Sequence, residues 1–119
     1  MTPEDATALA ISEARPGGDS LLLIVRNGED PGTERMRQLV SALKTIFHSL
    51  NGRAELARNL AAALYTLGSD VPLTISSLAS QGHIWRKGFM EVEVYDLLMV
   101  VQSIFEDRWL EPEPAETVH

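Results

Sequence analysis

Apolar side chains recur every three or four residues in two stretches of this chain, a spacing that places them on one face of an α-helix. In residues 36–50 the apolar positions that follow this spacing are 36, 39, 40, 43, 46, 47 and 50. In the second stretch they are 90, 94, 97, 98, 101, 104 and 105. The pattern predicts two long amphipathic helices, the second over residues 90–109, that bury these faces against other helices.

The segment between the two stretches is rich in alanine and leucine. Residues 53–67 leave few positions for polar side chains, which is typical of a helix at the centre of a bundle. Gly52 can close the preceding helix in a left-handed conformation, so we expect the two helices to pack antiparallel as an αα-hairpin. Gly68 is expected to end the central helix, and Pro72 to begin a shorter helix that runs to about Ser80.

The N-terminal part of the chain carries clear helix-boundary signals. Thr2 followed by Pro3 is a good helix start, since the hydroxyl can cap the first turn and proline suits the first helical position. Residues 19–27 contain an apolar run that fits either a buried strand or a short helix. We favour a short helix capped by Asp19 or Ser20, because no second convincing strand exists to pair with it.

These segments predict an all-α protein. We expect a compact, irregular or orthogonal bundle of five or six helices around the central alanine- and leucine-rich helix. A chain of 119 residues with 45% hydrophobic content matches one domain with one core, which we place at residues 1–110. For residues 111–119 the composition predicts a disordered, acidic, proline-containing tail.

Composition narrows the classes of partner. The formal net charge of −7 repels phosphate backbones and anionic lipid headgroups, so we expect neither nucleic acid nor a membrane surface as the main partner. Cysteine is absent, which excludes disulfides, thiolate catalysis and cysteine-based metal sites. The N-terminus lacks the cationic start and apolar core of a signal peptide, and the longest apolar run is too short to span a bilayer. We therefore expect a cytoplasmic protein.

Residues 73–79 resemble the first helix of a helix-turn-helix, and Arg86 and Lys87 follow soon after. A recognition helix would then begin near Phe89. Its carboxylates would face the DNA phosphates, so a DNA-binding regulator is the least favoured hypothesis; these residues are Glu91, Glu93 and Asp96.

The sequence contains no recognisable motif for catalysis or cofactor binding. The histidines at positions 48, 83 and 119 belong to none of the spacings that place metal ligands on one helical face. The serines form no nucleophile elbow, and the glycines form neither a Walker loop nor a dinucleotide-binding loop. We therefore predict no metal site and no cofactor, and the sequence does not favour an enzyme.

A second apolar strip on the last long helix is the most informative functional feature. Val92, Tyr95 and Met99 lie nearly opposite the main apolar face, and Leu110 falls in the same direction. A helix that is apolar on two sides is either enclosed by its own chain or covered by a partner. Trp85, which precedes two cations, is a further candidate anchor for an acidic partner.

We therefore predict a small protein-interaction module that acts as an adaptor, a chaperone-like protein or a regulatory partner and forms a homodimer through these apolar helix faces. The alternative is a small-molecule-binding or enzymatic bundle, in which Tyr65, His83 and Tyr95 line a pocket between helices. Convergence of these three side chains on one pocket would favour the alternative.

Overall fold

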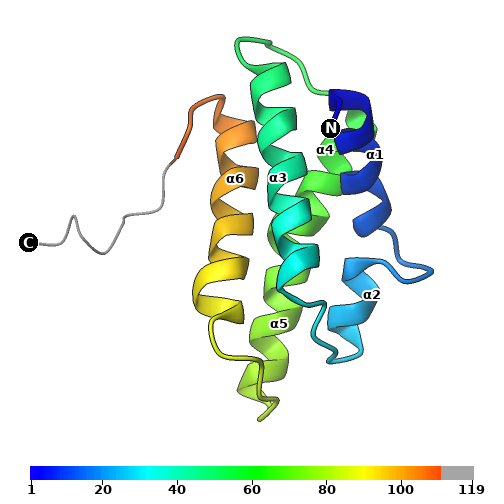
Figure 1. The fold of residues 1–119 in the computed structure, drawn as a ribbon, viewed down its shortest axis with the longest axis vertical. Helices are drawn as coiled ribbons and strands as arrows, with labels where there is room; N and C mark the ends of the chain where they lie inside the picture. Colours follow the sequence, from blue (N-terminus) through cyan, green and yellow to red (C-terminus); the bar gives the residue numbers. More distant parts are fainter. Residues whose placement is uncertain (111–119) are drawn as a thin grey trace, which may run out of the picture.

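Two long helices that lie side by side and run in the same direction form the front of the molecule (Figure 1). They are α3 (Thr33–Leu50) and α6 (Tyr95–Glu106) in a computed structural model that describes residues 1–110. A π-helical segment, η2 (Phe89–Val94), leads directly into α6. Within the described residues every regular element is helical, which confirms the predicted all-α bundle. The tail predicted for residues 111–119 lies outside this range.

The remaining helices lie beside and behind α3 (Figure 1). α1 (Pro3–Glu13) and α2 (Leu21–Arg26) lie on the side of α3 that faces away from α6. Behind them, α4 (Arg58–Tyr65) passes through a π-helical segment, η1 (Thr66–Asp70), into α5 (Val71–Ser80).

The helix starts predicted near the N-terminus are confirmed. Thr2 Oγ1 accepts a hydrogen bond from the Asp5 N–H (3.1 Å) at the start of α1. The apolar run within residues 19–27 forms α2, and Ser20 Oγ caps it by accepting from the Leu23 N–H (3.3 Å). The helical alternative for this run is therefore the correct one.

A buried ion pair joins the first three helices. Glu13 at the end of α1 is buried, and its carboxylate accepts two hydrogen bonds from Arg35 of α3, at 2.8 and 2.6 Å. The same carboxylate accepts the Leu21 N–H at the start of α2 (3.0 Å). A buried carboxylate is costly unless it is paired and hydrogen-bonded, so these bonds hold α1, α2 and α3 in one arrangement.

The periodic apolar positions form the core, with one exception. All seven positions of the first stretch are buried or half-buried on α3. In the second stretch positions 90, 94, 97, 98, 101 and 104 are buried or half-buried as well. Phe105 is 51% exposed, because it lies at the edge of the apolar face rather than at its centre.

The predicted central helix begins later than expected. Residues 53–57 are not helical, and α4 starts only at Arg58. α4 packs against α1 instead of folding back on α3, so the predicted αα-hairpin is wrong. The non-helical link, from which Leu56 packs against the core, allows the chain to cross from the end of α3 to α1.

The central helix also continues past the residues predicted to break it. At η1 the Val71 N–H donates to the Thr66 carbonyl, so the turn just before Pro72 is wider than an α-helical turn. Proline lacks an N–H and its ring crowds the preceding turn, and the wider turn relieves this conflict. α4, η1 and α5 therefore form one rod that contacts α1, α6 and α2, and it holds the central place predicted for the alanine- and leucine-rich helix.

Gly68 is a packing residue and not a helix terminator. A Cβ atom at this position would lie 2.8 Å from Cγ1 of Val101 on α6. The absence of a side chain at Gly68 therefore allows α6 to approach the rod closely.

We expect Gly68→Ala to lower the free energy of unfolding by about 1 kcal/mol. Val101 is buried and stiff at its first side-chain torsion, so overpacking at roughly 1–3 kcal/mol outweighs the roughly 1 kcal/mol by which alanine favours a helix over glycine. Urea denaturation measures the difference. Gly17→Ala is the control, because nothing lies within 4 Å of its Cβ position. A Gly68→Ala variant as stable as the wild type would contradict the close packing.

Candidate functional site

An open groove lies between α3 and α6. Its larger part has a volume of about 370 Å³ and an adjoining smaller part about 100 Å³. Val40, Lys44 and Asp96 line both parts, so the two form one continuous hollow, which we call the α3–α6 groove. Its other lining residues are Thr33, Met36, Arg37 and Ser41 on α3, Val92, Glu93, Met99 and Val100 on η2 and α6, and Trp109 and Leu110 beyond α6.

The groove has an apolar floor between charged walls. Met36 is buried beneath it, and Val40 is half-buried. Arg37 and Lys44 are exposed on the α3 wall, whereas Asp96 is half-buried on the α6 wall. An apolar centre with a polar rim is typical of surfaces that bind a protein segment.

Val92 lies in the π-helical segment η2, beside this groove. The N–H groups of Val92 and Glu93 both donate to the Gly88 carbonyl, at 3.1 and 3.3 Å. The bond from Glu93 makes the turn wider than an α-helical one. Val92 is 56% exposed beside the groove, while Val94 is buried in the core. Single π-helical turns are frequent at functional sites.

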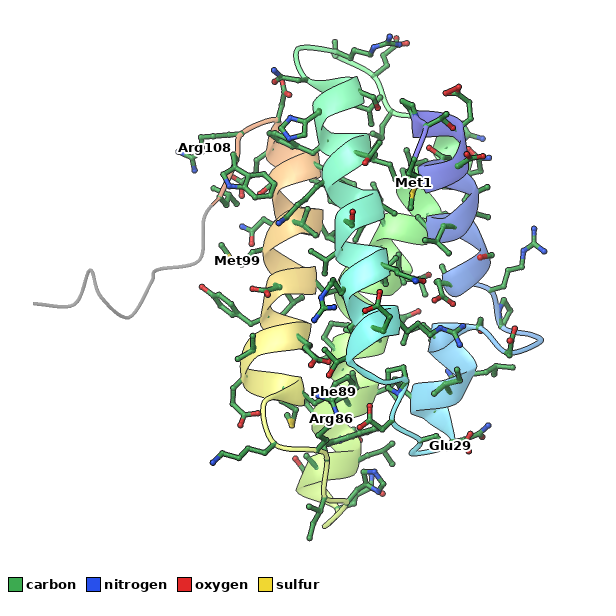
Figure 2. The ribbon with its side chains drawn as sticks, viewed as in Figure 1. Met1, Glu29, Arg86, Phe89, Met99 and Arg108 are labelled. Atoms are coloured by element: carbon green, nitrogen blue, oxygen red, sulfur yellow. The ribbon has the colours of Figure 1, made fainter. Side chains whose placement is uncertain are left out.

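An ion-pair network closes the lower end of the groove (Figure 2). The Arg86 guanidinium donates to Asp30, at 2.6 and 3.1 Å, and to Glu93, with two bonds of 2.8 Å. The Thr33 hydroxyl at the start of α3 also donates to Glu93 (2.9 Å). The hydrogen bonds from Arg86 lower the pKa of both carboxyls. The network therefore keeps Glu93 ionised and joins the connector before η2 to the start of α3.

Asp96 is the carboxylate in the middle of the groove. Burial raises its pKa, the positive charge of Lys44 opposes this shift, and the negative charge of Glu93 adds to it. Such a carboxylate favours an incoming cation or hydrogen-bond donor, because the new partner stabilises the charged form that burial disfavours.

Trp109 closes the upper end of the groove. Its ring packs edge-on against Phe47 of α3, with 5.2 Å between ring centroids. Lys44 Nζ lies 5.9 Å from the centre of the same ring, within range of a cation–π interaction. The Leu110 N–H donates to Ser103 Oγ (2.9 Å), which holds the end of the described chain against α6.

Three residues that the sequence singles out for partner binding meet in this groove. Val92, Met99 and Leu110 all line it. Figure 2 shows Met99 on α6, well above Arg86 at the lower end. Tyr95 is 40% exposed on α6 and does not line either part of the groove.

Trp85 lies in the connector between α5 and η2 and does not line the groove. Its indole N–H donates to the Ile75 carbonyl (3.1 Å), and its ring packs against Phe89 (5.2 Å) and His83 (4.4 Å). These contacts are those of a residue that covers the core. Its role as an anchor for an acidic partner stays a prediction.

The residues of the predicted ligand pocket do not line the α3–α6 groove. Tyr65 is 63% exposed on α4, and Tyr95 lies on α6. The His83 ring packs against Trp85 and lies beside Gly28, where a Cβ atom would be 3.2 Å away. A pocket formed by these three residues stays a prediction.

The charged walls escaped prediction from the sequence. Lys44 falls on the polar face of its helix, and Asp96 falls near the start of the last long helix, where the exposed backbone amides already explain a carboxylate. Only the way in which α3 and α6 pack brings the two residues to the same part of the groove. No signal within either helix marks this pair.

No protein-family model, curated protein or solved structure matches this chain. Among residues 1–110, no helix is both long enough and apolar enough to cross a membrane. In the same part of the chain, no cluster of three or more histidine and carboxylate side chains has the arrangement of a metal site. The identification of the α3–α6 groove as the candidate functional site rests on its geometry and not on any relative.

We expect Arg86→Gln to lower the free energy of unfolding by about 1–2 kcal/mol at neutral pH, because two carboxylates lose their shared cation. In the folded state the pKa values of Asp30 and Glu93 lie below their ordinary values of 3.8 and 4.5. The stabilisation is therefore complete above those values and is lost as the pH falls through the lowered ones. Urea denaturation over a pH series should show the wild type and the variant converging in acid.

Arg37→Gln is the control for this experiment. Its ion pair with Glu34 is exposed on both sides, so we expect a loss of at most about 0.5 kcal/mol. An equally small loss for Arg86→Gln, or a difference that persists at strongly acid pH, would show that the network does not stabilise the fold.

Proposed function

We propose that this chain is a small cytoplasmic protein-interaction module that binds an apolar segment of another protein molecule in the α3–α6 groove. The observation that supports this most directly is the position of Val92, an exposed aliphatic side chain beside a hollow with an apolar floor. A single exposed apolar side chain is ordinary. Here, however, Val92, Met99 and Leu110 meet in one groove.

The shape of the groove favours a protein segment over a small molecule. Small-molecule sites enclose most of the surface of their ligand, whereas this groove is open along two helices. A helix or an extended segment laid along it can place apolar side chains on the floor. The polar groups of such a segment can then meet Lys44 and Asp96 on the walls.

Such a module acts by holding its partner, as an adaptor, a chaperone-like protein or a regulator. Its net charge of −7 lowers unspecific binding to nucleic acid, and a chain without cysteine suits a reducing compartment. Both properties support the cytoplasm as the place in which it acts.

We expect Val92→Asp to weaken peptide binding about tenfold or more, because it places a charge beside the apolar floor of the groove. The probes are peptides selected from a phage-displayed random library on the full chain, and fluorescence polarisation measures their affinity. Ile84→Asp is the matched control. Ile84 is also an exposed aliphatic side chain, at 89%, but it does not line the groove.

The selected peptides should contain apolar anchors, and on binding they should shift the amide NMR signals of α3 and α6. Peptides that bind the two variants equally well would exclude the groove as their site. A library that yields no binder on a chain that is also monomeric would count against the proposed function, because no second copy then fills the groove.

A further inference from the structure

We propose that the natural occupant of the α3–α6 groove is a second copy of this chain, placed so that α6 of each copy lies along α3 of the other. This inference rests on the proposed function, since it names the partner of the same groove. Two observations carry it: the directions of the two helices, and the distribution of charge on the groove walls.

α3 and α6 run in the same direction along the groove (Figure 1). At one end Thr33, the first residue of α3, is hydrogen-bonded to Glu93 in the segment that leads into α6 (2.9 Å). At the other end Phe47 of α3 contacts Trp109, just beyond α6. A two-fold axis along the groove therefore sets α6 of one copy on α3 of the other, with residues at matching heights.

The charges on the groove walls distinguish this arrangement from one whose two-fold axis runs across the groove. Arg37 and Lys44 lie on the α3 wall, and Asp96 lies on the α6 wall in the same stretch of groove as Lys44. A two-fold axis along the groove brings Lys44 of each copy to Asp96 of the other. An axis across the groove would set α3 on α3 instead and bring cation to cation. Like charges that face each other oppose association, so the first arrangement is favoured.

The surroundings of these charges leave them open to a partner. Arg37 makes an exposed pair with Glu34, which is weak in water. Lys44 is exposed and lies beside the Trp109 ring. The other acidic residue of the groove is already held by the guanidinium network at the lower end. Asp96 is therefore the carboxylate on which the pairing between copies depends.

The apolar parts of the groove are also self-complementary. Val92 protrudes beside a hollow whose floor contains Met36 and Val40, so each copy offers both a protruding side chain and a surface to receive it. A two-fold interface uses every such contact twice. The net charge of −7 opposes association at long range, but it is screened beyond a Debye length of about 8 Å at physiological salt, while contacts inside the groove are screened less.

Charge reversal tests the arrangement. In sedimentation velocity at micromolar concentration, the full wild-type chain should be a dimer. Lys44→Glu and Asp96→Lys should each weaken the dimer about tenfold or more, because each turns two attractive pairs into repulsive ones. An equimolar mixture of the two variants should restore the dimer, since the reversed charges then face each other across the interface. Mixing is preferable to a double variant, because Lys44 and Asp96 also interact within one chain.

Lys87→Glu is the matched control, because it reverses the charge of an exposed lysine that does not line the groove. It should leave the dimer unchanged, and circular dichroism shows whether each variant is folded. A mixture of folded variants that stays monomeric overturns the arrangement. Should Asp96→Lys fail to fold, equal dimer strength in Lys44→Glu and Lys87→Glu overturns it.

The failure of this inference is distinguishable from the failure of the proposed function. A wild-type chain that is monomeric throughout, but whose selected peptides lose affinity with Val92→Asp, excludes the second copy and retains the groove as a binding site. A dimer that neither Val92→Asp nor Lys44→Glu weakens lies on another surface and overturns the inference.

Discussion

Two neighbouring helices that run in the same direction are the constraint on which the rest of this structure depends. α3 has 18 residues and spans about 27 Å, so the chain has to return over that distance before α6 can begin beside the start of α3. α4, η1 and α5 make this return as one rod of about 35 Å. A break at Gly68 or Pro72 would interrupt it. The widened turn before Pro72 is therefore part of the topology, since it keeps the returning rod continuous.

The same constraint leaves a groove between the two front helices. The network of Arg86 and Glu93 joins them at one end, and Trp109 joins them at the other. Between these ends several of the lining side chains are short or charged, as Ser41 and Asp96 are. Moving a charged group out of water without a partner costs free energy, so the charged side chains do not pack together to close the groove.

Local signals predicted helix boundaries well where the cap and the backbone it binds belong to one turn, as Thr2 and Ser20 show. Gly68 carries the same kind of signal, but its role is decided by Val101, which belongs to a helix much later in the chain. Such a contact cannot be found from neighbouring residues. This is why the all-α class was predictable and the packing of α4 was not.

The residues of the candidate site likewise fall into those that can be found from the sequence of one helix and those that cannot. An apolar strip on one helix is a local property, so Val92 and Met99 could be found from the sequence. The count of 100° per residue sets Val92 and Met99 together, opposite the main face of their helix, and both residues line the groove. The relation between Lys44 and Asp96 depends on the direction in which α3 and α6 pack, and this direction is set by the whole returning chain.

Asp96 imposes a condition on whatever the groove binds. Covering the groove would remove more water from a carboxyl whose pKa burial already raises. A purely apolar segment would bury that charge further without adding a partner beyond Lys44 of its own chain, and burying a charge is costly unless it is paired and hydrogen-bonded. A segment that brings a cation to the height of Asp96 offsets this cost. A segment without such a cation does not, so the cost of desolvating Asp96 disfavours the wrong partner. The apolar floor therefore supplies attraction, while the charged walls decide which partner, and in which orientation, can be accepted.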